Sequence, residues 1–172
     1  NPGYGLVVHP PLGKQFEALG MAVFGYTPWG WRIMSALLAV MTILLIATIA
    51  RRVSKSDLIG LFAGIIALCD GILFVTGRSA MLDHFQVFLV CLATYFAVRD
   101  AEQMEARFQH VWAADRIHDF ALGPRMGYRW WRFAAGVALG LSLSVKWNGL
   151  YYMAFFGVMI VAVDYFRRRR FG

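Results

Sequence analysis

The feature that most constrains this chain is the run from Ile33 to Ala50, which contains no charged residue. Such a run is long enough to cross a bilayer as a helix. The composition agrees, because 59% of the 172 residues are hydrophobic, only 16% are charged, and the mean hydropathy is +0.56. A soluble domain carries roughly 25% charged residues. The sequence therefore predicts an all-α integral membrane protein.

Apolar segments recur along the chain and predict about five transmembrane helices, at residues 28–50, 58–76, 81–98, 130–146 and 150–166. At about 1.5 Å per residue and about 30 Å of hydrocarbon, most of these segments are long enough to span. The fourth is long enough only if Trp130 and Trp131 belong to it. Residues 1–172 thus read as one membrane-embedded domain.

Two segments lie outside the predicted spans. The loop at residues 1–27 holds Leu12, Phe16 and Leu19 at helical spacing, which indicates a short amphipathic helix in the membrane interface. Residues 99–132 are polar and mixed in charge, and we expect a loop there with a surface helix. The chain starts at Asn1 without a methionine and stops after a basic run, so we expect a piece of a longer polytopic protein.

Basic residues stand beside the apolar segments, at Arg51 and Arg52 and again from Arg167 to Arg170. The positive-inside rule places these groups and the 99–132 loop in the cytoplasm. The net charge of +7 therefore reflects topology, and no nucleic-acid partner is indicated. The extracytoplasmic face of the plasma membrane then gathers a set of ionisable residues: His9, Lys14, Arg32, Arg78, Asp83, His84 and Lys146.

The segment His9-Pro10-Pro11 predicts a sharp turn, because proline has a fixed φ and no N–H group, and a helix can begin at Pro11. This geometry would present His9 and Lys14 to the same ligand, although such a turn is more often structural. Asp70 lies well inside the second apolar segment, where a carboxylate is costly. It is either functional or a structural contact between helices.

Arg78, Asp83 and His84 bring a cation, an acid and a base onto one short hairpin, and that clustering favours a site. A guanidinium can clamp a phosphate with two hydrogen bonds, or it can anchor a helix end at the interface. The same two interpretations apply to Arg32 and Lys146. No zinc-ligand spacing, Gly-rich phosphate loop or Ser-His-Asp set is present, so no metal ligand is assigned.

Six pieces, in this order, resemble the bacterial form of the protein O-mannosyltransferase family: Val8-His9-Pro10-Pro11-Leu12-Gly13-Lys14, Pro28-Trp29-Gly30-Trp31-Arg32, Asp70-Gly71, Arg78 with Leu82-Asp83, Arg99-Asp100, and Lys146-Trp147-Asn148-Gly149-Leu150. The resemblance implies a glycosyltransferase of the GT-C membrane fold. Such an enzyme moves mannose from polyprenyl-phosphate-mannose to Ser or Thr hydroxyls of exported proteins. Its partners would be membrane lipid, the lipid-linked sugar and translocating acceptor proteins.

The resemblance also implies roles for single residues. The family's catalytic base belongs to an Asp-Glu pair upstream of the His-Pro-Pro segment. We expect that pair upstream of Asn1, so this chain would be an internal fragment that is inactive alone. The segment from His9 to Lys14 would shape the donor and acceptor site. Arg78, with Arg32 or Lys146, would face the carrier phosphate. The remaining candidates would position these groups or contact the mannose: Asp70, Asp83 and His84. A divalent metal requirement is left open.

Other classes of protein share part of this pattern. Another GT-C enzyme could move a sugar from a lipid phosphate to a glycan or a lipid. A polytopic transporter could use Asp70 on its substrate path, but the chain shows no internal repeat. A structural membrane subunit would leave the charges on the outer face unexplained.

Overall fold

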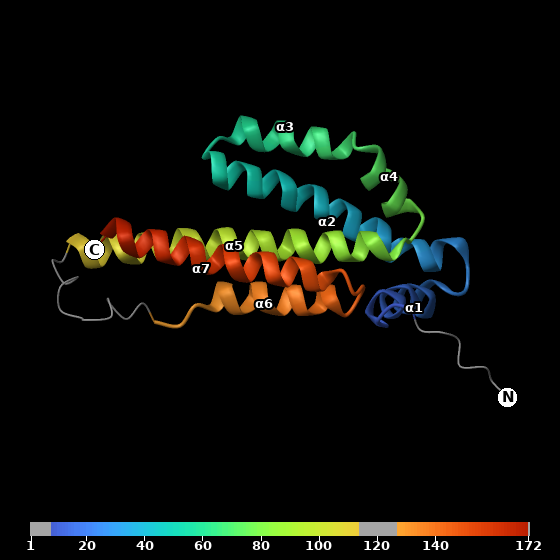
Figure 1. The fold of residues 1–172 in the computed structure, drawn as a ribbon. Coiled ribbons are helices and arrows are strands. Elements are labelled where there is room, and N and C mark those ends of the chain that lie inside the picture. The colour runs from blue at the N-terminus through green and yellow to red at the C-terminus, as the bar shows by residue number, and fades with distance from the viewer. Residues whose placement is uncertain (1–7, 114–126, 172) are drawn as a thin grey trace.

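The computed structural model describes residues 8–113 and 127–171, and within them the secondary structure is entirely helical. Its helices are α1 (Leu12–Phe24), α2 (Pro28–Ser54), α3 (Asp57–Leu68), α4 (Gly71–Arg78), α5 (Leu82–Ala113), α6 (Trp130–Leu143) and α7 (Gly149–Phe171). The long helices α2, α5 and α7 run lengthwise with α6 beside them, and α1 lies at one end (Figure 1). We call that end, which also holds α4 and the 144–148 turn, the α1 end.

Helix α1 lies in the segment where the short amphipathic helix is predicted, and α2 covers the first predicted span. Pro11 precedes α1, and its carbonyl accepts from the Gln15 N–H at 3.0 Å. At the start of α2, the Thr27 hydroxyl accepts from the Gly30 N–H at 3.2 Å, and Pro28 holds the first helical position. These are the expected N-terminal signals of a helix.

The predicted loop at residues 1–27 is therefore helical from Leu12 to Phe24. Its first part, from Asn1 to Val7, lies outside the described residues. The acidic pair expected upstream of Asn1 lies outside this chain altogether and stays a prediction.

The segment predicted as the second span, residues 58–76 with Asp70 inside it, contains a break at that residue. The segment is broken into α3 and α4, whose axes differ by 59°. Asp70 stands at the break, where its carboxylate accepts from the Leu73 N–H at 2.7 Å and so caps α4. The segment is apolar on both sides of Asp70, so hydropathy marks the charged residue but does not show that a new helix begins after it.

The predicted loop at residues 99–132 is partly helix, because α5 continues from the apolar segment to Ala113. Its polar end is stabilised by ion pairs with neighbouring helices, such as Arg52 Nη1 to Glu102 Oε2 at 2.9 Å. Residues 114–126 of that predicted loop lie outside the described residues.

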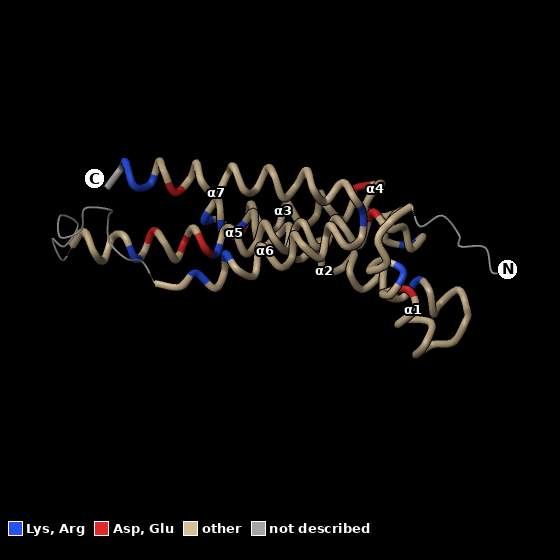
Figure 2. The backbone as a smooth tube through the Cα atoms, turned by 60° about the horizontal axis from the view of Figure 1, so that its bottom comes forward, with Lys and Arg blue, Asp and Glu red and all other residues tan. Residues whose placement is uncertain are grey.

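Within the described residues, α2, α5 and α7 are each long and apolar enough to cross a membrane, and the bent pair α3–α4 makes a fourth candidate. Helix α6 has 14 residues and is therefore only about 21 Å long, short of the roughly 30 Å of a hydrocarbon core. Figure 2 shows the charged residues toward the two ends of the helices, with an uncharged stretch between them. This distribution is typical of a membrane protein.

Two kinds of packing hold the α1 end in place. Phe16 of α1 stacks on Phe85 of α5, with ring centroids 5.6 Å apart and planes within 7°, beside the buried Leu38 and Val145. Gly13 permits a close approach of α1 to α5, since a Cβ there would lie 2.5 Å from Leu82 Cδ2. Helix α1 therefore packs directly on the start of α5.

Candidate functional site

The His-Pro-Pro segment lies against the turn that joins α6 and α7. The Leu12 N–H donates to the Ser144 carbonyl at 3.0 Å, and the Trp147 indole N–H donates to the Val8 carbonyl at 3.1 Å. These contacts bring together two motifs that are more than 130 residues apart in the sequence. His9 Nδ1 is buried there without a hydrogen-bond partner among the described residues.

Lys146 and Asp83 form an ion pair in the same region, with Lys146 Nζ 2.5 Å from Asp83 Oδ1. The pair joins the α6–α7 turn to the first turn of α5. Because the Asp83 carboxylate compensates the charge on Lys146, this lysine is less available to an anionic ligand than an unpaired cation would be.

His84 is fully buried and faces α4 rather than the surface of the α1 end. Its Nδ1 lies 3.3 Å from the Thr76 hydroxyl, and its Nε2 has no hydrogen-bond partner among the described residues. Gly77 lies beside the imidazole and allows α4 to pack closely on α2, because a Cβ there would lie 2.7 Å from Ala39 Cβ. The structure therefore separates His84 from Asp83, its neighbour in the sequence.

Arg32 and Arg78 line one pocket of about 350 Å³ between the start of α2 and the end of α4. This volume falls in the range of small-molecule sites, about 300–1,000 Å³. The rest of the lining is apolar: Pro28, Trp29, Ile33 and Ala36. Thus two of the predicted cations, 46 positions apart in the chain, meet at one apolar cavity.

Both guanidinium groups form cation–π contacts with aromatic rings. Arg32 Cζ lies 4.4 Å from the centroid of the Trp31 ring, and Arg78 Cζ lies 4.8 Å from that of Phe74. Neither arginine forms an ion pair with a described residue, and no described carboxylate lines their pocket. Two uncompensated positive charges on an apolar pocket favour an anionic ligand that has an apolar part.

None of the other predicted site residues lines this pocket. Asp70 is exposed at the opposite end of α4 from Arg78, about 12 Å away along the axis of an eight-residue helix. Lys14 is exposed on α1. It lowers the pKa of Glu17, but burial is the larger effect and raises the net pKa of that carboxyl above its ordinary value.

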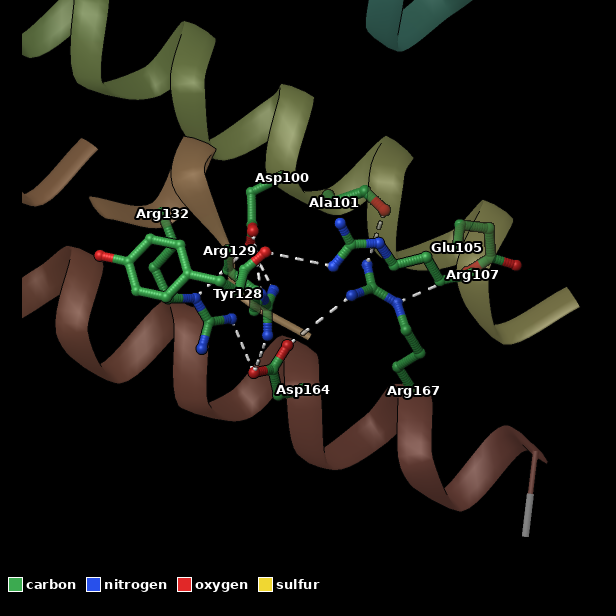
Figure 3. Close-up of polar contacts among 9 residues, drawn as sticks. All are labelled: Asp100, Ala101, Glu105, Arg107, Tyr128, Arg129, Arg132, Asp164 and Arg167. Carbon is green, nitrogen blue, oxygen red and sulfur yellow. Dashed lines mark hydrogen bonds and ion pairs between the residues drawn. The ribbon is translucent and has the colours of Figure 1, made fainter. Parts of the chain in front are cut away.

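Sequence reasoning missed an ionic cluster at the end of the helices opposite α1 (Figure 3). Arg129 donates from Nε to Asp100 Oδ1 at 2.9 Å and from Nη1 to Asp164 Oδ2 at 2.7 Å, so it bridges α5 and α7. Arg132 Nη2 also donates to Asp164, at 2.6 Å. A signal was available, since Asp164 is the one acidic residue in the last apolar segment, where an unpaired carboxylate is costly.

The long apolar helices, with charges gathered at their two ends, define a polytopic helical membrane protein. The model of the family described as dolichyl-phosphate-mannose-protein mannosyltransferase matches residues 8–114, and the chain belongs to this family. The family predicted from the sequence motifs is thereby confirmed.

Relatives of known name agree with this assignment. A polyprenol-phosphate-mannose–protein mannosyltransferase of Corynebacterium glutamicum is 54% identical over 172 residues, which is 100% of this chain and 33% of that protein. The protein of the same name from Mycobacterium tuberculosis is 48% identical over 171 residues, or 99% of this chain and 33% of the relative. A Candida albicans dolichyl-phosphate-mannose–protein mannosyltransferase is 26% identical over 174 residues, 90% of this chain and 17% of the relative. The chain spans about a third of the length of its bacterial relatives. No solved structure matches it.

Proposed function

We propose that the protein containing this chain transfers mannose from polyprenyl-phosphate-mannose to Ser or Thr hydroxyls of exported proteins. The observation that carries the proposal is the Arg32–Arg78 pocket, which offers two uncompensated cations and apolar walls to a lipid-linked phosphate. The names of the bacterial relatives supply the sugar and the protein acceptor.

In this proposal the carrier phosphate lies between Arg78 and Arg32, and the start of the polyprenyl chain lies against Ile33 and Ala36. Lys146 is the weaker candidate for the phosphate, because Asp83 already pairs with it. A guanidinium fits the chemistry, since it presents two N–H groups in a plane to two phosphate oxygens.

The chemical step needs stabilisation of the leaving group and a base. The acceptor hydroxyl oxygen forms a bond to the anomeric carbon while the bond from that carbon to the phosphate oxygen breaks, and the phosphate keeps the electron pair. Arg32 and Arg78 would stabilise that developing charge. The proton of the hydroxyl passes to a carboxylate base, and none of the described residues lining the pocket is a carboxylate. The base therefore comes from elsewhere, and the acidic pair that the resemblance implies upstream of Asn1 is the candidate for it.

The other predicted residues would have supporting roles. The segment from His9 to Lys14, held by the α6–α7 turn, would form one wall of the donor and acceptor site. Asp83 and the buried His84 would position the start of α5 and the end of α4. Asp70, as the cap of α4, would act on Arg78 only through the position of that helix.

The proposed topology has five spans in a GT-C fold, with α3–α4 as a bent span and α6 as the short one. The α1 end would face the extracytoplasmic side of the plasma membrane. The arginines of the opposite end would then lie in the cytoplasm, as the positive-inside rule requires.

The test is an assay of the whole protein in membranes with a polyprenyl-phosphate-mannose donor and two matched peptides, one containing Ser and Thr and the other containing Ala in their place. Mannose on the first peptide alone supports the proposal. Mannose transferred to a lipid or glycan acceptor instead would assign the protein to a different lipid-phosphate-sugar transferase. Transport of the donor without transfer would make it a transporter.

A further inference from the structure

A second pocket, of about 200 Å³, lies between α5 and α7 at the end of the helices opposite α1. Its walls along the helices are apolar and include Ala97 and Val98 on α5 and Ile160 and Val163 on α7. Its polar end is the ionic cluster of Figure 3, which contributes Asp100, Arg129, Arg132, Asp164 and Arg167 to the lining.

Some N–H donors of the arginines in this cluster have no hydrogen-bond acceptor among the described residues. Arg167 donates from Nη2 to the Ala101 carbonyl at 3.3 Å, and its Nε lies 3.5 Å from Glu105 Oε2. Its Nη1, however, is buried without a hydrogen-bond partner among the described residues, and the nearest carboxylate oxygen, Asp164 Oδ1, is 3.7 Å away. That distance is too long for a hydrogen bond.

Arg132 repeats this pattern on the other side of Asp164. Its Nη2 is paired with that carboxylate, whereas its Nε is buried without a hydrogen-bond partner in the described part of the chain and lies 3.5 Å from Asp100 Oδ2. Only 10% of the Arg167 side chain is exposed, so bulk water does not readily serve its unused donor. The pocket thus ends at two buried N–H groups that lack an acceptor among the described residues.

We propose that this pocket binds the phosphate of an anionic phospholipid, with the start of an acyl chain against the apolar walls of α5 and α7. Phosphate oxygens accept hydrogen bonds and match the unused donors of Arg132 and Arg167. The charges of Asp100, Glu105 and Asp164 balance those of Arg129, Arg132 and Arg167. The two unused N–H groups are therefore what the pocket offers to the phosphate.

The size and position of the pocket agree with a lipid. At about 200 Å³ it is smaller than a typical small-molecule site and has room for a headgroup phosphate and a short length of chain. Basic pockets between transmembrane helices are established sites for anionic headgroups. This site is distinct from the Arg32–Arg78 pocket and does not depend on the proposed mannosyl transfer.

The test compares lipid retention by the protein in nanodiscs of phosphatidylcholine with and without phosphatidylglycerol, measured by native mass spectrometry. We expect Arg167→Gln to lower retained phosphatidylglycerol about tenfold, the effect of one lost charge-assisted hydrogen bond. Arg169→Gln is the matched control, because Arg169 is exposed, lies over the Tyr165 ring and does not line the pocket. It should change retention less than about twofold.

A second variant keeps every charge. Val163→Phe places a larger side chain in the apolar part of the pocket, at a half-exposed position. It should also lower the amount of phosphatidylglycerol retained. The melting temperature of this variant in phosphatidylcholine should stay near that of the wild type. Equal retention of both lipids, equal loss in the two arginine variants, or unchanged retention in Val163→Phe would overturn the proposal. Inorganic phosphate that displaces the lipid at low concentration would show a free-phosphate site instead and would also overturn it.

Discussion

Lys146 Nζ and Asp83 Oδ1 lie 2.5 Å apart, although the two residues are separated by 63 positions in the sequence. Half of the Asp83 side chain is exposed, so solvent screens the pair and its contribution is small. In a double-mutant cycle of Lys146→Gln and Asp83→Asn, we expect a coupling free energy of unfolding below about 1 kcal/mol. Thermal unfolding in detergent measures it, and a coupling of several kcal/mol would show that this pair stabilises the α1 end.

Gly60 of α3 allows the close packing of α3 on α2, because a Cβ there would lie 2.7 Å from Arg51 Cβ and 3.0 Å from the Ala47 carbonyl oxygen. We expect Gly60→Ala to lower the free energy of unfolding by about 1–3 kcal/mol through overpacking. Gly136→Ala is the control, since nothing lies within 4 Å of its Cβ position and helix propensity favours alanine. The comparison is a melting curve of each variant in the same detergent. Equal melting temperatures would contradict the α2–α3 packing.

Asp70 caps α4, and this role predicts a graded effect of substitution. Asp70→Ala should cost about 0.5–2 kcal/mol, whereas Asp70→Ser, which retains a capping oxygen, should cost less than half of that. Amide hydrogen exchange at Leu73 reports the loss of the cap directly. If Ser and Ala behaved alike and both abolished mannose transfer, Asp70 would have a role in the reaction that capping does not explain.

Asp100 pairs with Arg129 in the ionic cluster, where only 6% of the carboxylate side chain is exposed. Asp100→Ala leaves a largely buried guanidinium with one partner fewer, and we expect a loss of about 3 kcal/mol or more. The exposed pair Arg51–Asp57, at 3.5 Å, supplies the control. Asp57→Ala should change the unfolding free energy by less than about 1 kcal/mol. Similar losses in the two variants would mean that the cluster is not a stabilising contact between helices.

The apolar pattern predicts the positions of most helices, because a membrane span must be apolar over its whole length. It fails where polar contacts decide the structure. Asp70 caps a new helix, so the second segment is broken there. Helix α5 continues beyond its apolar part, where ion pairs such as Arg52–Glu102 join it to a neighbouring helix. Local hydropathy marks Asp70 as a charged residue in an apolar segment but does not show that it caps a helix, and it does not indicate the Arg52–Glu102 pair.

The candidate site, like the fold, can be predicted from the sequence only in part. One-sided topology predicts that Arg32 and Arg78 share an end of the molecule, and the structure places both on one pocket. The sequence does not predict that Lys146 is paired with Asp83, or that His84 turns inward to Thr76, because both depend on how distant helices pack. The cluster around Arg129 was missed because its three elements are far apart in the chain.

The central claim is that Arg78 and Arg32 bind the carrier phosphate, and the most direct measurement is mannose transfer by the whole protein at varied donor concentration. Arg78→Gln and Arg32→Gln should each lower kcat/KM for the donor by about tenfold or more, because each removes a charge-assisted contact to the leaving phosphate. Arg51→Gln, at the opposite end of α2 from Arg32, should leave it within about twofold of the wild type. Wild-type kcat/KM in both pocket variants, with the protein folded, would contradict the claim.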